Sequence, residues 1–213
     1  MKHLNKIVIL LITTLFIAGC DNSLERADKT VSLVQENVTS IVNELTEIQL
    51  AEGNLQAEFE STIANAGDDL TYFASDDSPI QQNIQRRKEH LTKLEEVRGE
   101  LDTMIEEFSN QVDNSPLPTE QVTNQITQLQ ELSQEIVTYI SDYRENIETE
   151  SIVYKSIANP ETDYSSFFAV FDRVSQLHTT NQINLERILG FFEPINAQLI
   201  NFKVYLANLQ ESN

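Results

Sequence analysis

Apolar side chains recur at alternating steps of three and four residues along most of the chain. The first series runs through Leu24, Ala27, Val31, Val34, Val38, Ile41, Leu45 and Ile48, and resumes at Leu55 and Phe59. This spacing places the side chains on one narrow stripe of an α-helix, which must be buried against partner helices. The stripe therefore predicts a long first helix, which Gly67-Asp68-Asp69 ends or breaks.

Three further segments show the same spacing and are separated by turn signals. Ser78-Pro79 suits a helix start, because Ser caps the first turn and Pro is tolerated at the first helical position. The stretch DNSPLPTE (residues 113–120) predicts a turn, and Asn159-Pro160 marks the start of the fourth segment. Pro194 lies inside that segment and predicts a kink, because it removes one backbone hydrogen bond.

The lengths of these segments determine the predicted architecture. At 1.5 Å per residue, segments of roughly 34–51 residues form rods of about 50–75 Å. Short turns between long helices favour antiparallel neighbours. We therefore predict an all-α fold, an elongated antiparallel bundle of three to four long, coiled-coil-like helices in one domain, residues 24–213. Residues 68–78 are compatible with either helix or loop, and the stripes are compatible with a partner chain that completes the bundle.

The N-terminal segment has the pattern of a signal peptide. Lys2 and Lys6 precede an apolar run of eleven residues, 7–17. A membrane-spanning helix needs about 20 apolar residues, so this run is too short to span but suits a signal-peptide core. We expect residues 1–19 to be removed.

The end of this segment, Ile17-Ala18-Gly19-Cys20, resembles a bacterial lipobox. The resemblance implies cleavage before Cys20, the only cysteine, and a diacylglyceryl group on its thiol, with residues 20–23 as lipidated Cys and short tether. Two acyl chains, at ~0.8 kcal/mol per buried CH₂, would anchor the chain at the outer face of the cytoplasmic membrane. The alternatives are an ordinary secretory signal with an unrelated cysteine and an uncleaved anchor.

The net charge of −20 excludes several classes of partner. Without Lys2 and Lys6, 12 basic residues face 34 acidic ones, a net charge of −22. Nucleic-acid binding requires a basic surface, and an anionic lipid surface would repel a body that lies flat on it. We therefore expect no nucleic-acid partner, and contact with the membrane only through the lipid anchor.

The sequence lacks recognisable catalytic and cofactor motifs. Beyond the N-terminal segment it has two histidines, His90 and His178, distant in sequence, and four isolated glycines. These residues match neither a metal-ligand motif nor a phosphate-binding loop. We predict no enzymatic activity, no metal site and no cofactor besides the lipid. The many carboxylates are interpreted as a solvated face.

Polar residues occupy some positions of the apolar stripes. His178 and Asn181 lie on the fourth stripe and are predicted either to fix helix register or to line a binding groove. The basic cluster Arg86-Arg87-Lys88 is interpreted as a solvated face that pairs with nearby Glu, although Arg87 occupies a stripe position.

The sequence also resembles a family as a whole. The lipobox, the early helix LERADKTVSLVQ and the last helix HTTNQINLERILGFFEPINAQLINFKVYL resemble the cell-wall-binding lipoproteins of Gram-positive bacteria of the YkyA type. The resemblance implies a wall-associated role. We expect a non-catalytic, membrane-anchored scaffold or interaction module for envelope proteins or the cell wall. The alternative is a module that captures a wall fragment, peptide or small ligand between helices near Pro194, in a pocket lined by Phe191, Phe192 and His178.

Overall fold

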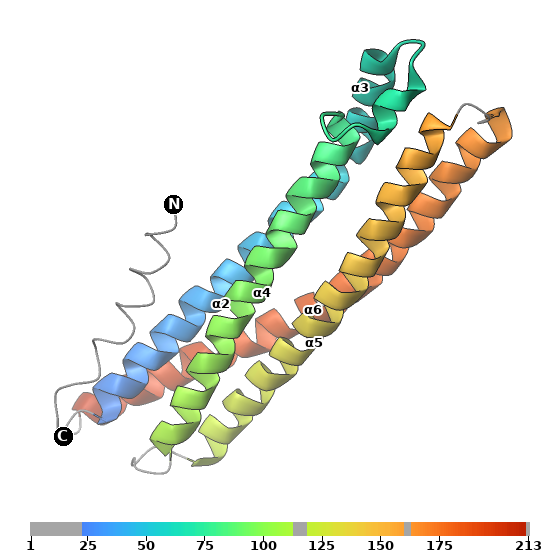
Figure 1. The fold of residues 1–213 in the computed structure, drawn as a ribbon. Coiled ribbons are helices and arrows are strands. Elements are labelled where there is room, and N and C mark those ends of the chain that lie inside the picture. Colours follow the sequence, from blue (N-terminus) through green and yellow to red (C-terminus); the bar gives the residue numbers. More distant parts are fainter. Residues whose placement is uncertain (1–22, 113–118, 160–162, 212–213) are drawn as a thin grey trace.

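The computed structural model describes residues 23–112, 119–159 and 163–211, and these residues form an elongated antiparallel helical bundle (Figure 1). Its elements in chain order are α2 (Ser23–Gly53), α3 (Leu55–Ala66), η1 (Leu70–Ala74), α4 (Pro79–Val112), α5 (Thr119–Lys155), η2 (Ser156–Ala158) and α6 (Tyr164–Glu211). Here η1 and η2 are short 3₁₀ helices. The described residues contain no strand, so the all-α prediction is confirmed.

Each long helix packs on the next along the chain. The contacts join α2 to α4, α4 to α5, α5 to α6, and α6 back to α2, which closes a four-helix ring. The start of α2 and the end of α6 lie together at one end of the rod, which we call the base (Figure 1). At the other end, α3, η1 and η2 form the tip (Figure 1). None of the described helices is apolar over a stretch long enough to cross a lipid bilayer.

The core consists of the predicted apolar stripes. Almost all stripe residues of the first segment are buried, from Ala27 to Phe59, and the other helices contribute the same kind of seam. At about 25 cal/mol per Å² of apolar surface removed from water, these seams are the main stabilising term of the bundle. The apolar series of the fourth segment also includes Phe171, which is an exception because 40% of its surface remains exposed.

Local backbone chemistry sets the helix ends at the tip. Gly67 follows α3 with φ +56°, a left-handed conformation that L side chains rarely adopt, and this confirms the predicted end of the first helical segment. Asp69 accepts a hydrogen bond from the Thr71 backbone N–H and thereby caps η1. The range 68–78 is thus a 3₁₀ turn with flanking loop. Helix α6 runs through Pro194 and does not end there.

The first helical segment is divided at a position that the sequence did not predict. Asn54 alone separates α2, which ends at Gly53, from α3, where the sequence pattern suggested only an interruption of the stripe at Glu52. Beyond this break, α3 packs on α4 and η1, whereas α2 packs on both α4 and α6. The first half of α6 is therefore less closely covered beside α3 than it is beside α2.

Candidate binding groove

An apolar groove lies between α3 and the first half of α6, near the tip. Its volume is about 930 Å³, which is in the usual range of ligand sites, about 300–1,000 Å³. Residues from the end of α2, from α3, from α5 and from α6 line it. They are Glu52, Gly53, Leu55, Gln56, Phe59, Glu60, Ile63, Tyr154, Phe168, Phe171, Val174, Ser175, His178, Thr179, Gln182 and Ile183.

Aromatic rings build the tip-side wall of the groove. The Phe59 ring lies edge-on to Phe171, with ring centroids 4.7 Å apart, and also contacts Phe73 at 5.3 Å and Tyr154 at 5.9 Å. Phe59 is buried, whereas Phe168 and Phe171 are 48% and 40% exposed. Exposed aromatic rings beside a buried one offer a ligand an apolar surface that is already held in place.

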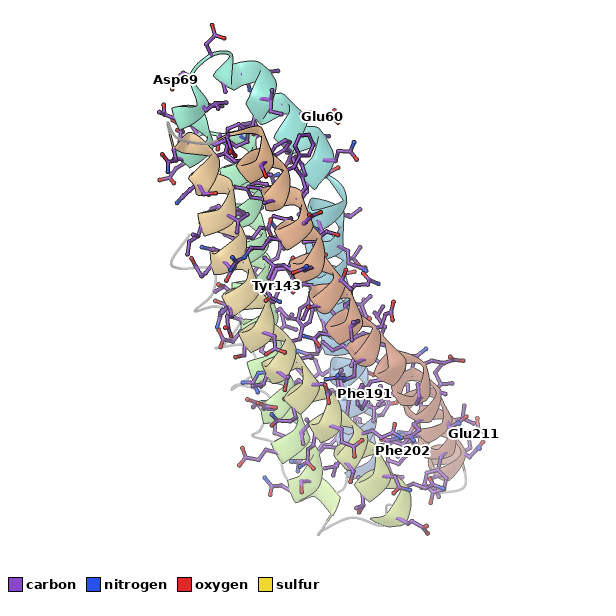
Figure 2. All side chains as sticks on the ribbon, turned by 90° about the vertical axis from the view of Figure 1, so that its right-hand side faces the viewer. Glu60, Asp69, Tyr143, Phe191, Phe202 and Glu211 are labelled. Atoms are coloured by element: carbon purple, nitrogen blue, oxygen red, sulfur yellow. The ribbon has the colours of Figure 1, made fainter. Side chains whose placement is uncertain are left out.

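The charged groups of the groove are acidic. Glu52 lies at the end of α2 and Glu60 on α3, where Figure 2 labels it, and His178 lies opposite on α6. Among the residues that the structure describes, no Lys or Arg lines the groove. The groove thus combines an apolar wall with carboxylates, which is a suitable environment for cationic rather than anionic groups.

Behind the groove, the bundle interior contains a buried ion pair. Arg87 on α4 and Glu150 on α5 are both fully buried. The Arg87 Nη2–Glu150 Oε1 distance is 2.5 Å and the Arg87 Nη1–Glu150 Oε2 distance is 2.9 Å, a bidentate arrangement. Arg87 Nε also donates to Asn83 Oδ1 at 2.7 Å. Asn83 in turn donates to the Ala51 carbonyl oxygen at 2.6 Å, which ties the pair to α2.

A chain of hydrogen bonds joins this ion pair to the groove. Arg87 Nη1 donates to the Tyr143 hydroxyl at 3.2 Å, and Tyr143 donates to Glu52 Oε1 at 2.7 Å. Figure 2 shows the Tyr143 side chain inside the bundle, between the helices. Asn181 Nδ2 donates to the same Glu52 oxygen at 3.2 Å, and Asn181 Oδ1 accepts from Asn146 Nδ2 at 2.8 Å. Glu52 is thereby held in one orientation by α5 and α6.

His178 borders both the groove and the ion pair. Its Nε2 atom is 3.5 Å from Glu150 Oε2, which is within ion-pair distance. The same buried Nε2 makes no well-aligned hydrogen bond to any described residue. The His178 side chain is 29% exposed and lines the groove. A ligand in the groove would therefore contact a group that lies directly against the buried pair.

Burial and charge shift the pKa values of this network. Burial would raise the pKa of Glu150, but the positive charge of Arg87 and the hydrogen bonds to the carboxylate outweigh it and hold that pKa below 4.5. Burial opposes the charged form of Arg87, yet Glu150 and Tyr143 raise its pKa above the ordinary value. Burial raises the pKa of Tyr143 well above 10, so its hydroxyl keeps the proton that it donates to Glu52.

The predicted site residues are Ile17, Ala18, Gly19 and Cys20 of the lipobox, and His178 and Asn181 of the fourth segment. Ile17, Ala18, Gly19 and Cys20 lie outside the described residues. The structure places His178 at the groove and Asn181, 2% exposed, in the buried network; the two are one helical turn apart on α6. Among the described residues, no three His, Cys, Asp or Glu side chains gather as a metal-binding group.

The interpretation of Arg86-Arg87-Lys88 as one solvated cluster was wrong for Arg87. Arg86 pairs with Glu58 and Lys88 with Glu148 at partly or well exposed positions, as expected, but Arg87 is fully buried. The sequence carried a signal for this, because Arg87 continues the step from Ile84 to Leu91. Its partner Glu150 also lies at a stripe position of its own segment.

Glu150 follows Tyr143 and Ile147 and precedes Tyr154 at steps of three and four residues. A carboxylate and a guanidinium on facing seams can compensate each other's charge when both are buried.

The groove itself differs from the predicted pocket near Pro194. It includes His178, but Phe191 and Phe192 are instead partly buried and packed against the core.

Comparison with protein families gave a match that covers most of the chain. The family model YkyA, described as "Putative cell-wall binding lipoprotein", matches residues 22–187. This range contains the lining residues of the groove and the whole buried network. Neither a search of curated proteins nor a search of solved structures found a match.

Proposed function

Because this chain belongs to the YkyA family of cell-wall binding lipoproteins, we propose that it is a non-catalytic interaction module held at the outer face of the cytoplasmic membrane. In this proposal the lipid on Cys20 is the anchor and the helical bundle is the part that meets envelope partners or the wall. The proposal is supported by the family match and by the lipobox pattern that ends at Cys20.

The observation that carries the proposal is the position of the groove relative to the N-terminus. Helix α2 begins at Ser23, three residues after Cys20, and continues for 31 residues to Gly53. At 1.5 Å per residue, α2 is about 45 Å long, and the groove begins at its far end. A lipid at Cys20 would therefore keep the base near the membrane, while repulsion between the acidic rod and anionic headgroups favours a rod that stands away from the surface.

The groove favours one form of this function, namely capture of a peptide, wall fragment or small ligand. A scaffold needs only a filled core and an exterior surface, whereas this bundle also presents about 930 Å³ of apolar groove with exposed Phe168 and Phe171. Exposed apolar surface in a groove is typical of ligand-binding and interaction sites. A ligand between α3 and α6 would cover the exposed faces of these rings.

The anchor is tested by a Cys20→Ser variant with fractionation and mass measurement. We expect the wild-type chain in the membrane fraction, lipidated and without residues 1–19. The variant should be secreted or retain its signal. A variant that remains membrane-bound at mature size would refute the lipid anchor.

The contact face is tested by photo-crosslinking in intact cells. A photoreactive amino acid replaces Gln182, which is exposed and lines the groove. The matched control replaces Glu131, an exposed residue of α5 that does not line the groove. We expect envelope or wall products from position 182 and none of these from position 131. The same products from both positions would argue against a specific contact face at the groove.

A further inference from the structure

We propose that the groove between α3 and α6 binds short peptides that carry an ammonium group next to an apolar side chain. This inference rests on the capture function proposed above and names its ligand class. Three observations carry it: the acidic lining, the fixed orientation of Glu52 and the exposed aromatic rings.

The lining has charge of one sign at the positions that a ligand would meet. Glu52 and Glu60 supply carboxylates, none of the described lining residues is Lys or Arg, and the whole chain has a net charge of −20. An anionic ligand would lose its hydration and face like charges. An ammonium group would find a counter-charge in the same place.

Glu52 has the geometry of a prepared acceptor. Its Oε1 atom accepts from Tyr143 and Asn181, so the position of the carboxylate is fixed before any ligand arrives. The hydrogen bonds of Glu52 to described residues use Oε1 and leave Oε2 unused, and Glu52 lines the groove. A carboxylate with one oxygen held and one open can accept a charge-assisted hydrogen bond with little loss of side-chain entropy.

The aromatic wall accounts for the apolar part of the ligand. Phe168 and Phe171 are exposed at the groove, their ring centroids 6.3 Å apart, and Phe171 is supported by the buried Phe59 ring. Such rings bind aliphatic or aromatic side chains, and their faces also attract an ammonium group. An acyl chain would use the rings alone and bring no positive charge to the two carboxylates. A second copy of this chain would bring more negative charge.

The test measures binding of three fluorescent tripeptides by fluorescence polarisation. The peptides are acetylated and amidated Phe-Lys-Leu, the same peptide with norleucine for Lys, and the same with Glu for Lys. The protein is the full chain in nanodiscs of neutral phosphatidylcholine, and empty nanodiscs correct for binding to lipid. Because norleucine cannot form the charge-assisted hydrogen bond that the Lys ammonium forms, we expect the Lys peptide to bind about tenfold or more tightly than the norleucine peptide. The Glu peptide should bind most weakly.

Variants then assign the selectivity to named residues. Glu52→Gln and Glu60→Gln should each reduce the preference for the Lys peptide and leave binding of the norleucine peptide nearly unchanged. Glu131→Gln removes the same charge from an exposed position outside the groove and should change neither. Phe171→Ala should weaken both peptides. Glu60 is exposed and lies outside the buried network, so its variant tests charge even where Glu52→Gln perturbs packing.

Several outcomes would overturn the inference. Equal affinity for the Lys and norleucine peptides would indicate a purely apolar occupant such as an acyl chain. No saturable binding, or equal effects of Glu52→Gln, Glu60→Gln and Glu131→Gln, would exclude the amine site. Self-association that Phe171→Ala abolishes would identify a second copy as occupant. Each of these results leaves the fractionation and crosslinking tests of the proposed function standing, so the two failures are distinguishable.

Discussion

Arg87 and Glu150 lie 63 positions apart in the chain and form a bidentate ion pair in the bundle interior, with Nη–Oε distances of 2.5 and 2.9 Å. Neither side chain is measurably exposed. Burying two charges is expensive, so the pair persists only because each group satisfies the other and Tyr143 and Asn83 take up further donors. Because Tyr143 joins Arg87 to Glu52 of the groove, the pair that stabilises the bundle also helps to position a groove residue.

Removing one member of the pair should destabilise the bundle strongly. Arg87→Met leaves an unpaired buried carboxylate, and we expect a loss of about 3–5 kcal/mol in the free energy of unfolding. The double variant with Glu150→Leu should be more stable than Arg87→Met alone. Urea denaturation followed by circular dichroism at 222 nm measures both.

A matched control for this experiment joins the same two helices at the surface. Arg144 and Glu95 form an ion pair at 2.8 Å, with side chains 43% and 51% exposed. Arg144→Met should change stability by less than about 1 kcal/mol. Equal losses of unfolding free energy from Arg87→Met and Arg144→Met would show that breaking the buried pair costs no more than breaking an exposed one.

The pair should also contribute a defined pH dependence. Because the pKa of Glu150 is lower in the folded state than in the unfolded chain, where it is about 4.3, its contribution is fully present above that value. It is lost as pH falls further and the folded carboxylate is protonated. The difference in unfolding free energy between wild type and Glu150→Gln should therefore be constant from pH 7 to 5 and shrink below about pH 4. A difference independent of pH down to 2 would contradict the lowered pKa.

Two glycines should respond to alanine in opposite directions. Gly67 adopts φ +56°, so Gly67→Ala is strained and should cost about 1 kcal/mol or more. Gly99 lies within α4, and nothing lies within 4 Å of a Cβ atom added there. Gly99→Ala should stabilise by about 0.5–1 kcal/mol because Ala favours the helix. Thermal unfolding of both variants checks the signs, and stabilisation by Gly67→Ala would refute the role of the left-handed turn.

Asn181 should prove necessary for stability and not only for helix register. Its amide joins Asn146 to Glu52 in the buried network, so Asn181→Leu leaves polar partners unsatisfied. We expect a loss of about 1–3 kcal/mol. Gln176→Leu, at an exposed position of the same helix, serves as the control and should be nearly neutral. A higher melting temperature for Asn181→Leu would instead support a pure register role.

Local sequence patterns, above all the apolar periodicity, predicted most of the fold. The stripes predicted the long helices and their buried faces, Ser78-Pro79 predicted the start of α4, and Gly67 predicted the end of the first helical segment. These features are local, because a step of three or four residues and a left-handed glycine depend only on neighbouring residues. The lipobox prediction at Cys20 is local in the same sense and awaits the fractionation test.

Only the tertiary structure decided which polar residues meet and where the surface is hollow. Arg87 and Glu150 each appear in the sequence as an irregularity in an apolar seam, but their pairing depends on the register of α4 against α5. The groove depends on the break after Gly53, beyond which α3 packs on α4 and η1. Relative register and helix divergence arise from packing between distant segments, and no local pattern specifies them. The sequence by itself therefore determined the helices and an expected membrane address, and packing between the helices created the candidate site.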